Sequence, residues 1–283
     1  MDATLVALKL QDVVRKNLMG SPVKCNSMSD LSQSALLRAS NVVAFALVVI
    51  VNILANLLPL NGRTTASISD SYPTLITPAG YVFSIWGVIY TLLLIFTVYQ
   101  ALPLNRDKPF LRQIGFFFLL SSLANAVWLF MWHYGFIALS VLPMFALLAS
   151  LIFIYTRLQI GRSAVTMQER LSVHVPFSVY LGWITVAPIA NVAAAVVSLD
   201  LNGLGLGEVT WAVLVIIVAL VITLAVIVTR RDIAYSLVIV WALVGIALKQ
   251  SDHQSIVFSA GAGAVVVLVA GVAVNLRSMF ARQ

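Results

Sequence analysis

Residues 209–229 read VTWAVLVIIVALVITLAVIVT, and Arg230 and Arg231 follow directly. The stretch contains no charged side chain. An α-helix needs about 20 mostly apolar residues to cross about 30 Å of hydrocarbon. The stretch therefore predicts a membrane-spanning helix that ends at a pair of arginines.

Seven further apolar runs have the same character. Hydrophobic residues make up 61% of the 283 residues and charged residues only 10%, whereas a soluble domain carries about 25% charged residues. The predicted fold class is therefore an all-α integral membrane protein with eight transmembrane helices. The predicted spans are 42–60, 79–101, 112–132, 135–156, 172–197, 209–229, 233–249 and 255–276.

The basic residues support this number of spans. With eight crossings, fifteen of the 17 Lys and Arg residues fall on one side, and only Arg63 and Lys249 fall on the other. Basic loops stay on the cytoplasmic side, so we expect both termini to be cytoplasmic. Adding or removing one span would reverse every later loop and destroy the asymmetry. Orientation thus accounts for the net charge of +7, and no nucleic-acid partner is expected.

Residues 1–41 form a polar, basic N-terminal arm. Val6, Leu10 and Val13 recur at roughly helical spacing, which suits a helix lying on the membrane surface. A frayed, solvated tail fits the same residues equally well. Cys25 is the single cysteine, so one chain can form neither a disulfide nor a cysteine-based metal site.

Residues for catalysis are hard to find. All ten acidic residues lie in loops, tails or helix ends, so a relay based on carboxylates within the membrane is not expected. His133, His174 and His253 are not paired with one another or with a carboxylate at the spacing of metal ligands. We therefore expect neither a metal site nor an enzyme.

Three predicted helices carry aromatic and amide side chains on one face each. Residues three or four apart share a helix face, and a buried Trp or Asn in lipid needs a hydrogen-bond partner. These faces should therefore point inward. Either they join the helices to one another or they line an aromatic ligand pocket. The residues are Trp86 and Tyr90, Asn125 and Trp128, and Trp183, Ala187 and Asn191; Asn52 and Asn56 similarly share a face of the first helix.

The same residues carry a resemblance to a known family. The stretch 77–83, TPAGYVF, followed by Trp86 and Tyr90, resembles the first loop and second helix of the TspO/MBR family, the translocator or tryptophan-rich sensory proteins. Asn125-x-x-Trp128 and Tyr180-Leu181-x-Trp183 are similar to motifs of its third and fifth helices. Ala79 and Tyr81 depart from the family's Pro and Trp. The segment 191–201 lacks the Tyr and Arg of the family's proposed sterol motif, so sterol binding is not implied.

The resemblance implies a five-helix bundle over residues 42–198, with a pocket under the first loop for a flat hydrophobic ligand such as a tetrapyrrole. Residues 199–283, three additional helices and a short tail, have no counterpart in the five-helix proteins. The resemblance implies that the pocket is lined by Phe83, Trp86, Trp128, Trp183 and Ala187, with polar contacts from Tyr90, Asn125 and Asn191.

The expected function is a ligand-binding membrane sensor or translocator-like protein. A transporter of a small hydrophobic molecule and a lipid-modifying membrane enzyme are the alternatives. No cofactor is required, although porphyrin or haem could be the ligand. The expected partners are the lipid bilayer and a hydrophobic small molecule, and a homodimer stays open. The expected location is a bacterial-type plasma membrane, with an organelle membrane as the other option.

Overall fold

The computed structural model describes residues 28–201 and 207–280, and side chains from Ser32 on except those of residues 56, 275 and 277–280. The surface helix predicted in the N-terminal arm, Cys25 and the Asn56 side chain lie outside this description. Every described element is helical. The long helices are α2 (Met28–Asn56), α4 (Ile85–Ala101), α6 (Phe117–His133), α7 (Ile137–Arg157), α9 (Val175–Ser198), α10 (Glu208–Arg230), α11 (Ile233–Lys249) and α12 (Gln254–Phe280).

Short helical segments connect the long helices. They are η1 (Leu60–Gly62) and α3 (Thr65–Asp70) in the first loop, η2 (Gly80–Ser84) before α4, η3 (Pro103–Asn105) and α5 (Phe110–Ile114) before α6, and α8 (Met167–Glu169) and the π-helical turn η4 (Arg170–His174) before α9.

Six segments are long and apolar enough to cross a membrane: 32–55, 80–101, 137–157, 167–198, 208–230 and 254–274. The apolar helices α6 and α11 have 17 residues each. At 1.5 Å per residue each is about 26 Å long, the lower end of what spans a bilayer. The protein is therefore an integral multi-pass membrane protein. The eight crossings and the orientation of the termini stay predictions.

Two of the predicted spans differ from the helices in extent. The first helix begins at Met28 rather than at residue 42. Its early part contains polar residues that are nevertheless buried: Asn41 is fully buried and donates to Gln100 Oε1 of α4 at 2.8 Å. The predicted span 112–132 is broken, because Gly115 has φ 54° and ψ −136° and ends α5 before α6 begins. Few residues other than glycine adopt that conformation.

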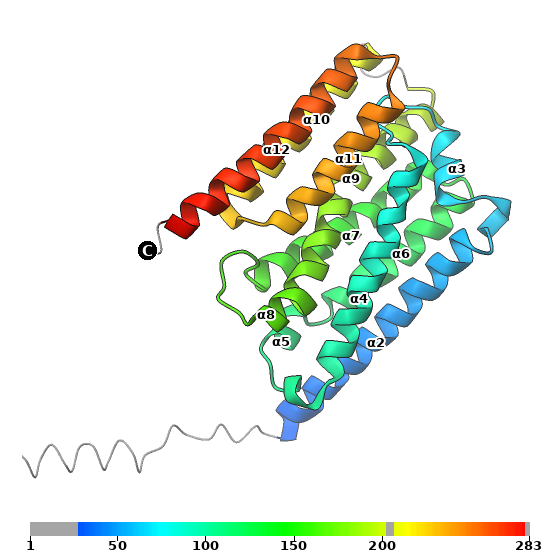
Figure 1. Cartoon of the computed structure of the whole chain (residues 1–283). Coiled ribbons are helices and arrows are strands. Elements are labelled where there is room, and N and C mark those ends of the chain that lie inside the picture. The colour runs from blue at the N-terminus through cyan, green and yellow to red at the C-terminus, as the bar shows by residue number, and fades with distance from the viewer. Residues whose placement is uncertain (1–27, 202–206, 281–283) are drawn as a thin grey trace, which may run out of the picture.

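The long helices pack in a bundle, with α2 at one flank and α12 at the other (Figure 1). From α2 the contacts run to α6, then α7, then α9, then α11 and α12. Helix α4 packs between α2 and α9. Helix α10 packs chiefly on α12, and it makes far less contact with α9. A space between α9 and α10 follows from this arrangement.

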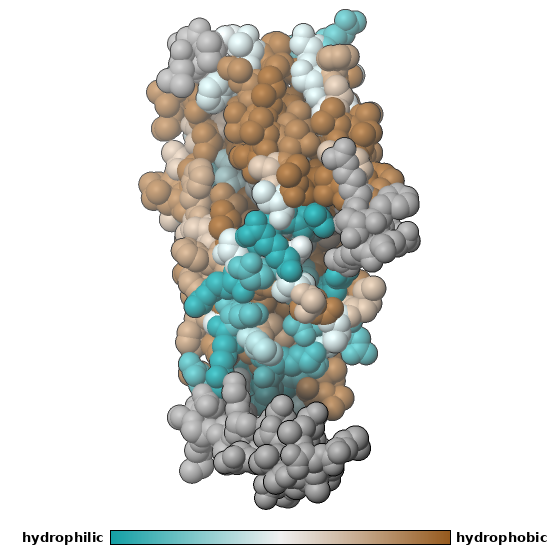
Figure 2. Space-filling view, turned by 90° about the vertical axis from the view of Figure 1, so that its left-hand side faces the viewer, coloured by the Kyte–Doolittle hydropathy of each residue, from teal (hydrophilic) through white to brown (hydrophobic). Residues whose placement is uncertain are grey.

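The outer surface suits a bilayer over most of its height. Figure 2 shows a broad apolar surface above a hydrophilic zone that lies at the level of α8 in Figure 1. Val218 and Val221 of α10 and Val269 of α12 are more than half exposed. In the loops predicted to be cytoplasmic, Lys108 Nζ pairs with Glu169 at 3.1 Å and donates to Tyr99 Oη at 3.0 Å. The hydrogen bond to Tyr99, and then the interaction with Glu169, raise the pKa of Lys108.

Candidate functional site

The aromatic faces of α4, α6 and α9 meet in the interior. The Trp86 ring stacks on Trp128 with 6.2 Å between centroids, and its edge meets Trp183 at 6.1 Å. Phe83, at the end of η2, meets the Trp183 ring at 5.9 Å. Offset and edge-to-face pairs at these distances are the favourable geometries for aromatic rings. The rings interlock and leave little space between them.

A small cavity of about 30 Å³ remains at this junction. Six of the eight residues named from the sequence line it: Phe83, Trp86, Trp128, Trp183, Ala187 and Asn191. The other lining residues are Thr65, Ser69, Pro78, Trp132, Val186 and Ala190. Of these, Trp132 carried a usable signal, because it follows Trp128 by four residues and the two rings stack at 5.8 Å. We call this space the aromatic cavity.

Tyr90 and Asn125 lie one layer further in and do not line the cavity. Tyr90 stacks on Trp86 at 5.6 Å. Asn125 Oδ1 accepts from Asn52 Nδ2 at 2.9 Å, and Asn125 Nδ2 donates to Tyr180 Oη at 3.4 Å. Asn125 therefore ties α6 to α2 and α9, which is the helix-joining role.

Asn191 lines the cavity and also joins helices. Its Oδ1 accepts from Trp128 Nε1 at 3.0 Å, and its Nδ2 donates to Ser140 Oγ of α7 at 2.9 Å. All three side chains are buried. In lipid such inter-helix hydrogen bonds hold helices together where the hydrophobic effect cannot.

Two polar atoms at the cavity have no partner among the described residues. Trp183 Nε1 and Thr65 Oγ1 are buried without a hydrogen bond, and each residue is only 3% exposed. A buried donor left unpaired costs about 1–3 kcal/mol. A space of about 30 Å³ can hold one water molecule or one polar atom of a ligand. Trp183 and Thr65, which both line the cavity, thus each carry a buried polar atom that lacks a partner among the described residues.

Helix α11 holds the segment that roofs this cavity. Ala79 N donates to Gly245 O at 3.1 Å, and Trp241 Nε1 donates to Val82 O at 3.1 Å. A Cβ at Gly245 would collide with the Val82 side chain, which is fully buried. We call residues 71–84 the roof segment. Helix α11, which lies outside the 42–198 bundle, therefore holds this segment in place.

Comparison with family models matches residues 37–273 to the TSPO-like protein family. The chain belongs to that family. The match runs through α10 and α11 and most of α12, well beyond the stretch 42–198 that carries the motif resemblance. No curated protein and no solved structure matches the chain.

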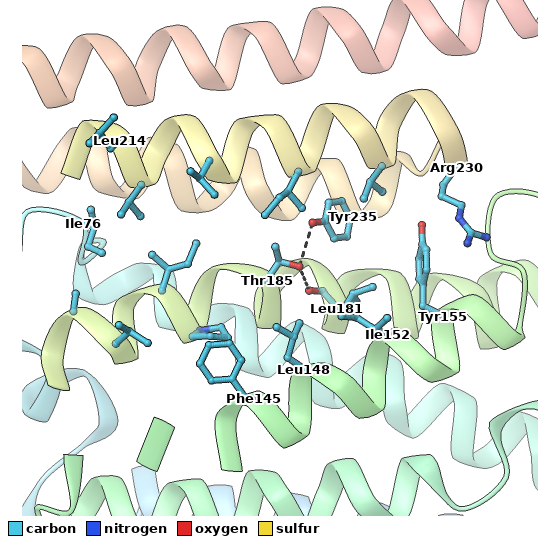
Figure 3. A pocket seen from close by; sticks show the side chains of 18 of the residues that line it. Ile76, Phe145, Leu148, Ile152, Tyr155, Leu181, Thr185, Leu214, Arg230 and Tyr235 are labelled. Atoms are coloured by element: carbon cyan, nitrogen blue, oxygen red, sulfur yellow. Dashed lines mark hydrogen bonds between the residues drawn. The ribbon is translucent and has the colours of Figure 1, made fainter. Parts of the chain in front are cut away.

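This TSPO-like protein has a second, much larger space, of about 690 Å³, between α7, α9 and α10 (Figure 3). We call it the groove. Its walls are almost wholly apolar, and no sequence motif marked it. The lining includes Phe145, Leu148, Ile152 and Tyr155 of α7, Leu181, Thr185 and Ile189 of α9, Trp211, Leu214, Val218, Ile222, Val226 and Arg230 of α10, and Tyr235 of α11.

One acidic residue is more deeply placed than its position at a helix end indicated. Asp232 is 8% exposed and caps α11 by accepting from Tyr235 N at 3.1 Å. Its other oxygen accepts from Tyr155 Oη at 2.9 Å and Ser178 Oγ at 2.6 Å. These bonds join the α10–α11 turn to α7 and α9. Among the described residues no group of three His, Cys, Asp or Glu side chains could hold a metal ion.

Proposed function

We propose that this TSPO-like protein is a non-catalytic membrane receptor or translocator-like protein that recognises a flat hydrophobic ligand at the aromatic cavity. The carrying observation is the Trp183 indole N–H, which is buried without an acceptor in a residue that lines the cavity and meets the Phe83 and Trp86 rings. Aromatic faces offer stacking, and the unpaired donor offers one directional contact. Binding sites for small molecules typically combine apolar walls with a few such polar groups.

The size of the cavity limits what can enter. Typical ligand pockets measure about 300–1,000 Å³, whereas this cavity measures about 30 Å³. A whole porphyrin or haem does not fit this arrangement of rings. The cavity fits one edge or substituent of a ligand, and a tetrapyrrole would require Phe83 and the roof segment to move away from Trp183. Among the possible flat ligands, a tetrapyrrole thus requires the largest rearrangement of the cavity.

The test is to titrate the purified protein with protoporphyrin and with smaller aromatic ligands. Binding is measured from the change in the absorbance of the ligand. Trp183→Phe keeps an aromatic ring but removes the N–H. We expect it to weaken binding about five- to tenfold, the effect of losing one hydrogen bond of about 1 kcal/mol. Trp211→Phe is the matched control, since Trp211 lines the groove and not the cavity. Equal affinity in both variants would remove the aromatic cavity as the site.

Transport of a small hydrophobic molecule is the second candidate, and the groove favours it, because a second apolar space reaches along the helices beside the first. Uptake of the same ligand into proteoliposomes would separate the two functions. A receptor binds the ligand without moving it, and a transporter fills the vesicle at a rate that Trp183→Phe reduces.

A further inference from the structure

The groove follows one face of α10 along almost its whole length. Its α10 lining residues include Trp211, Val218, Ile222 and Arg230, which recur at helical spacing from one end of the helix to the other. Arg230 lies 19 residues after Trp211. At a rise of 1.5 Å per residue, the two residues are about 28 Å apart along the helix axis. The groove therefore runs through nearly the full thickness of the hydrocarbon layer.

The groove is open to the surrounding bilayer along its side. Leu214, Val218 and Ile222 line it, and they are 44–55% exposed. A hydrocarbon tail can therefore enter the groove sideways from the lipid. Apolar walls facing a bilayer will be filled by hydrocarbon.

The hydroxyl groups along the walls are already hydrogen-bonded. Thr185 Oγ1 donates to Leu181 O at 2.8 Å and accepts from Tyr235 Oη at 3.1 Å (Figure 3). Tyr155 Oη donates to Asp232. At the end beside Tyr155, however, Arg230 Nη1 is buried and has no partner among the described residues. The Arg230 guanidinium lies 5.6 Å from the centre of the Tyr155 ring.

The charge at this end is positive overall. Arg231 is the next residue, and Arg162 Nε donates to Thr229 O at 3.3 Å, which places a third guanidinium at the end of α10. Asp232 is the opposing charge, and its oxygens are occupied by Tyr155, Ser178 and the Tyr235 N–H. An anionic headgroup would give Arg230 the partner that it lacks.

We propose that the groove binds a membrane lipid with one very long hydrocarbon tail and a phosphate headgroup, of the polyprenyl phosphate type, with the phosphate at Arg230. The tail must be long because the groove crosses the bilayer, and an ordinary acyl chain reaches only about half of the roughly 30 Å. One tail of that length is sufficient, because it lines the whole groove from Arg230 to Trp211. Basic sites between helices near the cytoplasmic surface are typical places for anionic lipid headgroups.

The experiment uses the full-length protein in micelles and measures lipid binding by native mass spectrometry. The probes are a polyprenyl phosphate long enough to span the bilayer, the polyprenol of the same length, and a two-chain phosphatidic acid. We expect the polyprenyl phosphate to bind most tightly and phosphatidic acid to bind weakly. Arg230→Gln should weaken the phosphate probe about tenfold, the loss of one charge-assisted contact, and leave polyprenol unchanged.

A second pair of variants tests the groove itself. Val218→Trp puts a large ring beside the groove, which Val218 lines, and Val221→Trp puts the same ring on a similarly exposed part of the same helix that does not line the groove. Val218→Trp should weaken both long-chain probes about tenfold or more, and Val221→Trp should weaken neither. Arg157→Gln is the charge control, because the Arg157 guanidinium lies over Phe117 instead.

Three results would overturn the proposal. Equal binding of phosphatidic acid and polyprenyl phosphate would show that the groove holds ordinary bilayer lipid. Unchanged affinity in Arg230→Gln would show that the headgroup lies elsewhere. Equal effects of Val218→Trp and Val221→Trp would show that the tail does not occupy the groove. Thermal unfolding of each variant confirms that it is folded, so that lost binding is not lost structure.

Discussion

The aromatic cavity and the groove lie on two faces of one helix, α9, and they differ more than twentyfold in volume, about 30 Å³ against about 690 Å³. Trp183, Ala187 and Asn191 face the cavity, and Leu181, Thr185 and Ile189 face the groove. On the first side large rings interlock with α4 and α6. On the second side, α10 carries smaller Val, Leu and Ile side chains and packs on α12 instead.

The difference follows from how helices associate in lipid. Apolar side chains gain little by leaving hydrocarbon, so ring contacts, hydrogen bonds and close backbone packing hold helices together. The cavity side has ring contacts and hydrogen bonds, whereas neither joins α10 to α9 among the described residues. Helix α10 is held elsewhere, where Gly263 of α12 receives the Leu220 side chain so closely that an added Cβ would lie 2.8 Å from it. Lipid can therefore replace protein between α9 and α10 at little cost.

The prediction with the largest effect is the orientation of the protein in the membrane. It decides which end of the aromatic cavity and which end of the groove face the cytoplasm. In a chain whose Cys25 is replaced by Ser, a cysteine at Ala66 or Asp252 should react with an impermeant reagent from outside, and one at Asp107 or Ser163 should not. The effect is all or none. It would place the roof of the aromatic cavity outside and the Arg230 end of the groove inside.

Labelling of position 252 from the inside, with position 66 still labelled from outside, would contradict the eight-span arrangement. The groove would then have its charged end away from the cytoplasmic leaflet, and the lipid proposal would lose its source of anionic headgroups.

The helical membrane fold was largely predictable, because the length and composition of each apolar run are by themselves typical of a spanning helix. Composition, run length and the fifteen-to-two distribution of Lys and Arg led to an all-helical membrane bundle. Helix ends were less predictable. Residues 28–41 look polar, yet Asn41 and Ser34 are buried against neighbouring elements, which no local pattern reveals. The break at Gly115 depends on one backbone conformation within an apolar stretch.

The aromatic cavity could be predicted in part, and the groove could not. Trp and Asn at helical spacing mark a face, so Trp86, Trp128 and Trp183 were expected to converge. Whether they leave space is a matter of side-chain packing, and here the rings fill most of it. The groove depends on α10 standing away from α9, and its Val and Leu residues are those of any spanning helix. In the sequence, Arg230 was interpreted as one of the basic residues that set the orientation in the membrane. Nothing in the sequence indicated that its guanidinium lies beside the Tyr155 ring.

The next largest effect is expected at the end of the groove. Gly161 has φ +79°, and a Cβ there would collide with the Arg230 backbone carbonyl. Gly161→Ala should therefore lower the free energy of unfolding by about 3 kcal/mol, through backbone strain and a clash that no side chain can relieve. Thermal unfolding in micelles measures it.

Gly135→Ala separates the cost of backbone strain from the cost of the steric clash. Gly135 has a similar φ of +82° but nothing within 4 Å of an added Cβ, so only the strain of about 1 kcal/mol should appear. Equal losses in the two variants would mean that the 158–163 turn does not close tightly on α10. Gly161→Ala should also weaken the lipid probe while leaving ligands of the aromatic cavity unaffected.

The smallest effect is expected in the aromatic cavity, from Asn191→Leu. The substitution leaves the Trp128 N–H without its acceptor and removes a partner of Ser140. Hydrogen bonds between helices in membranes average about 0.6 kcal/mol and reach about 1.7, so two lost contacts should cost about 1–2 kcal/mol of unfolding free energy. Gln254→Leu likewise replaces a side-chain amide by Leu, at an exposed position of α12, and should cost nearly nothing. Because Asn191 faces away from the groove, the lipid probe should bind Asn191→Leu as tightly as the unaltered protein. A variant that lost both lipid binding and stability would show that the two faces of α9 are coupled, and the cavity and the groove would then have to be treated as one site.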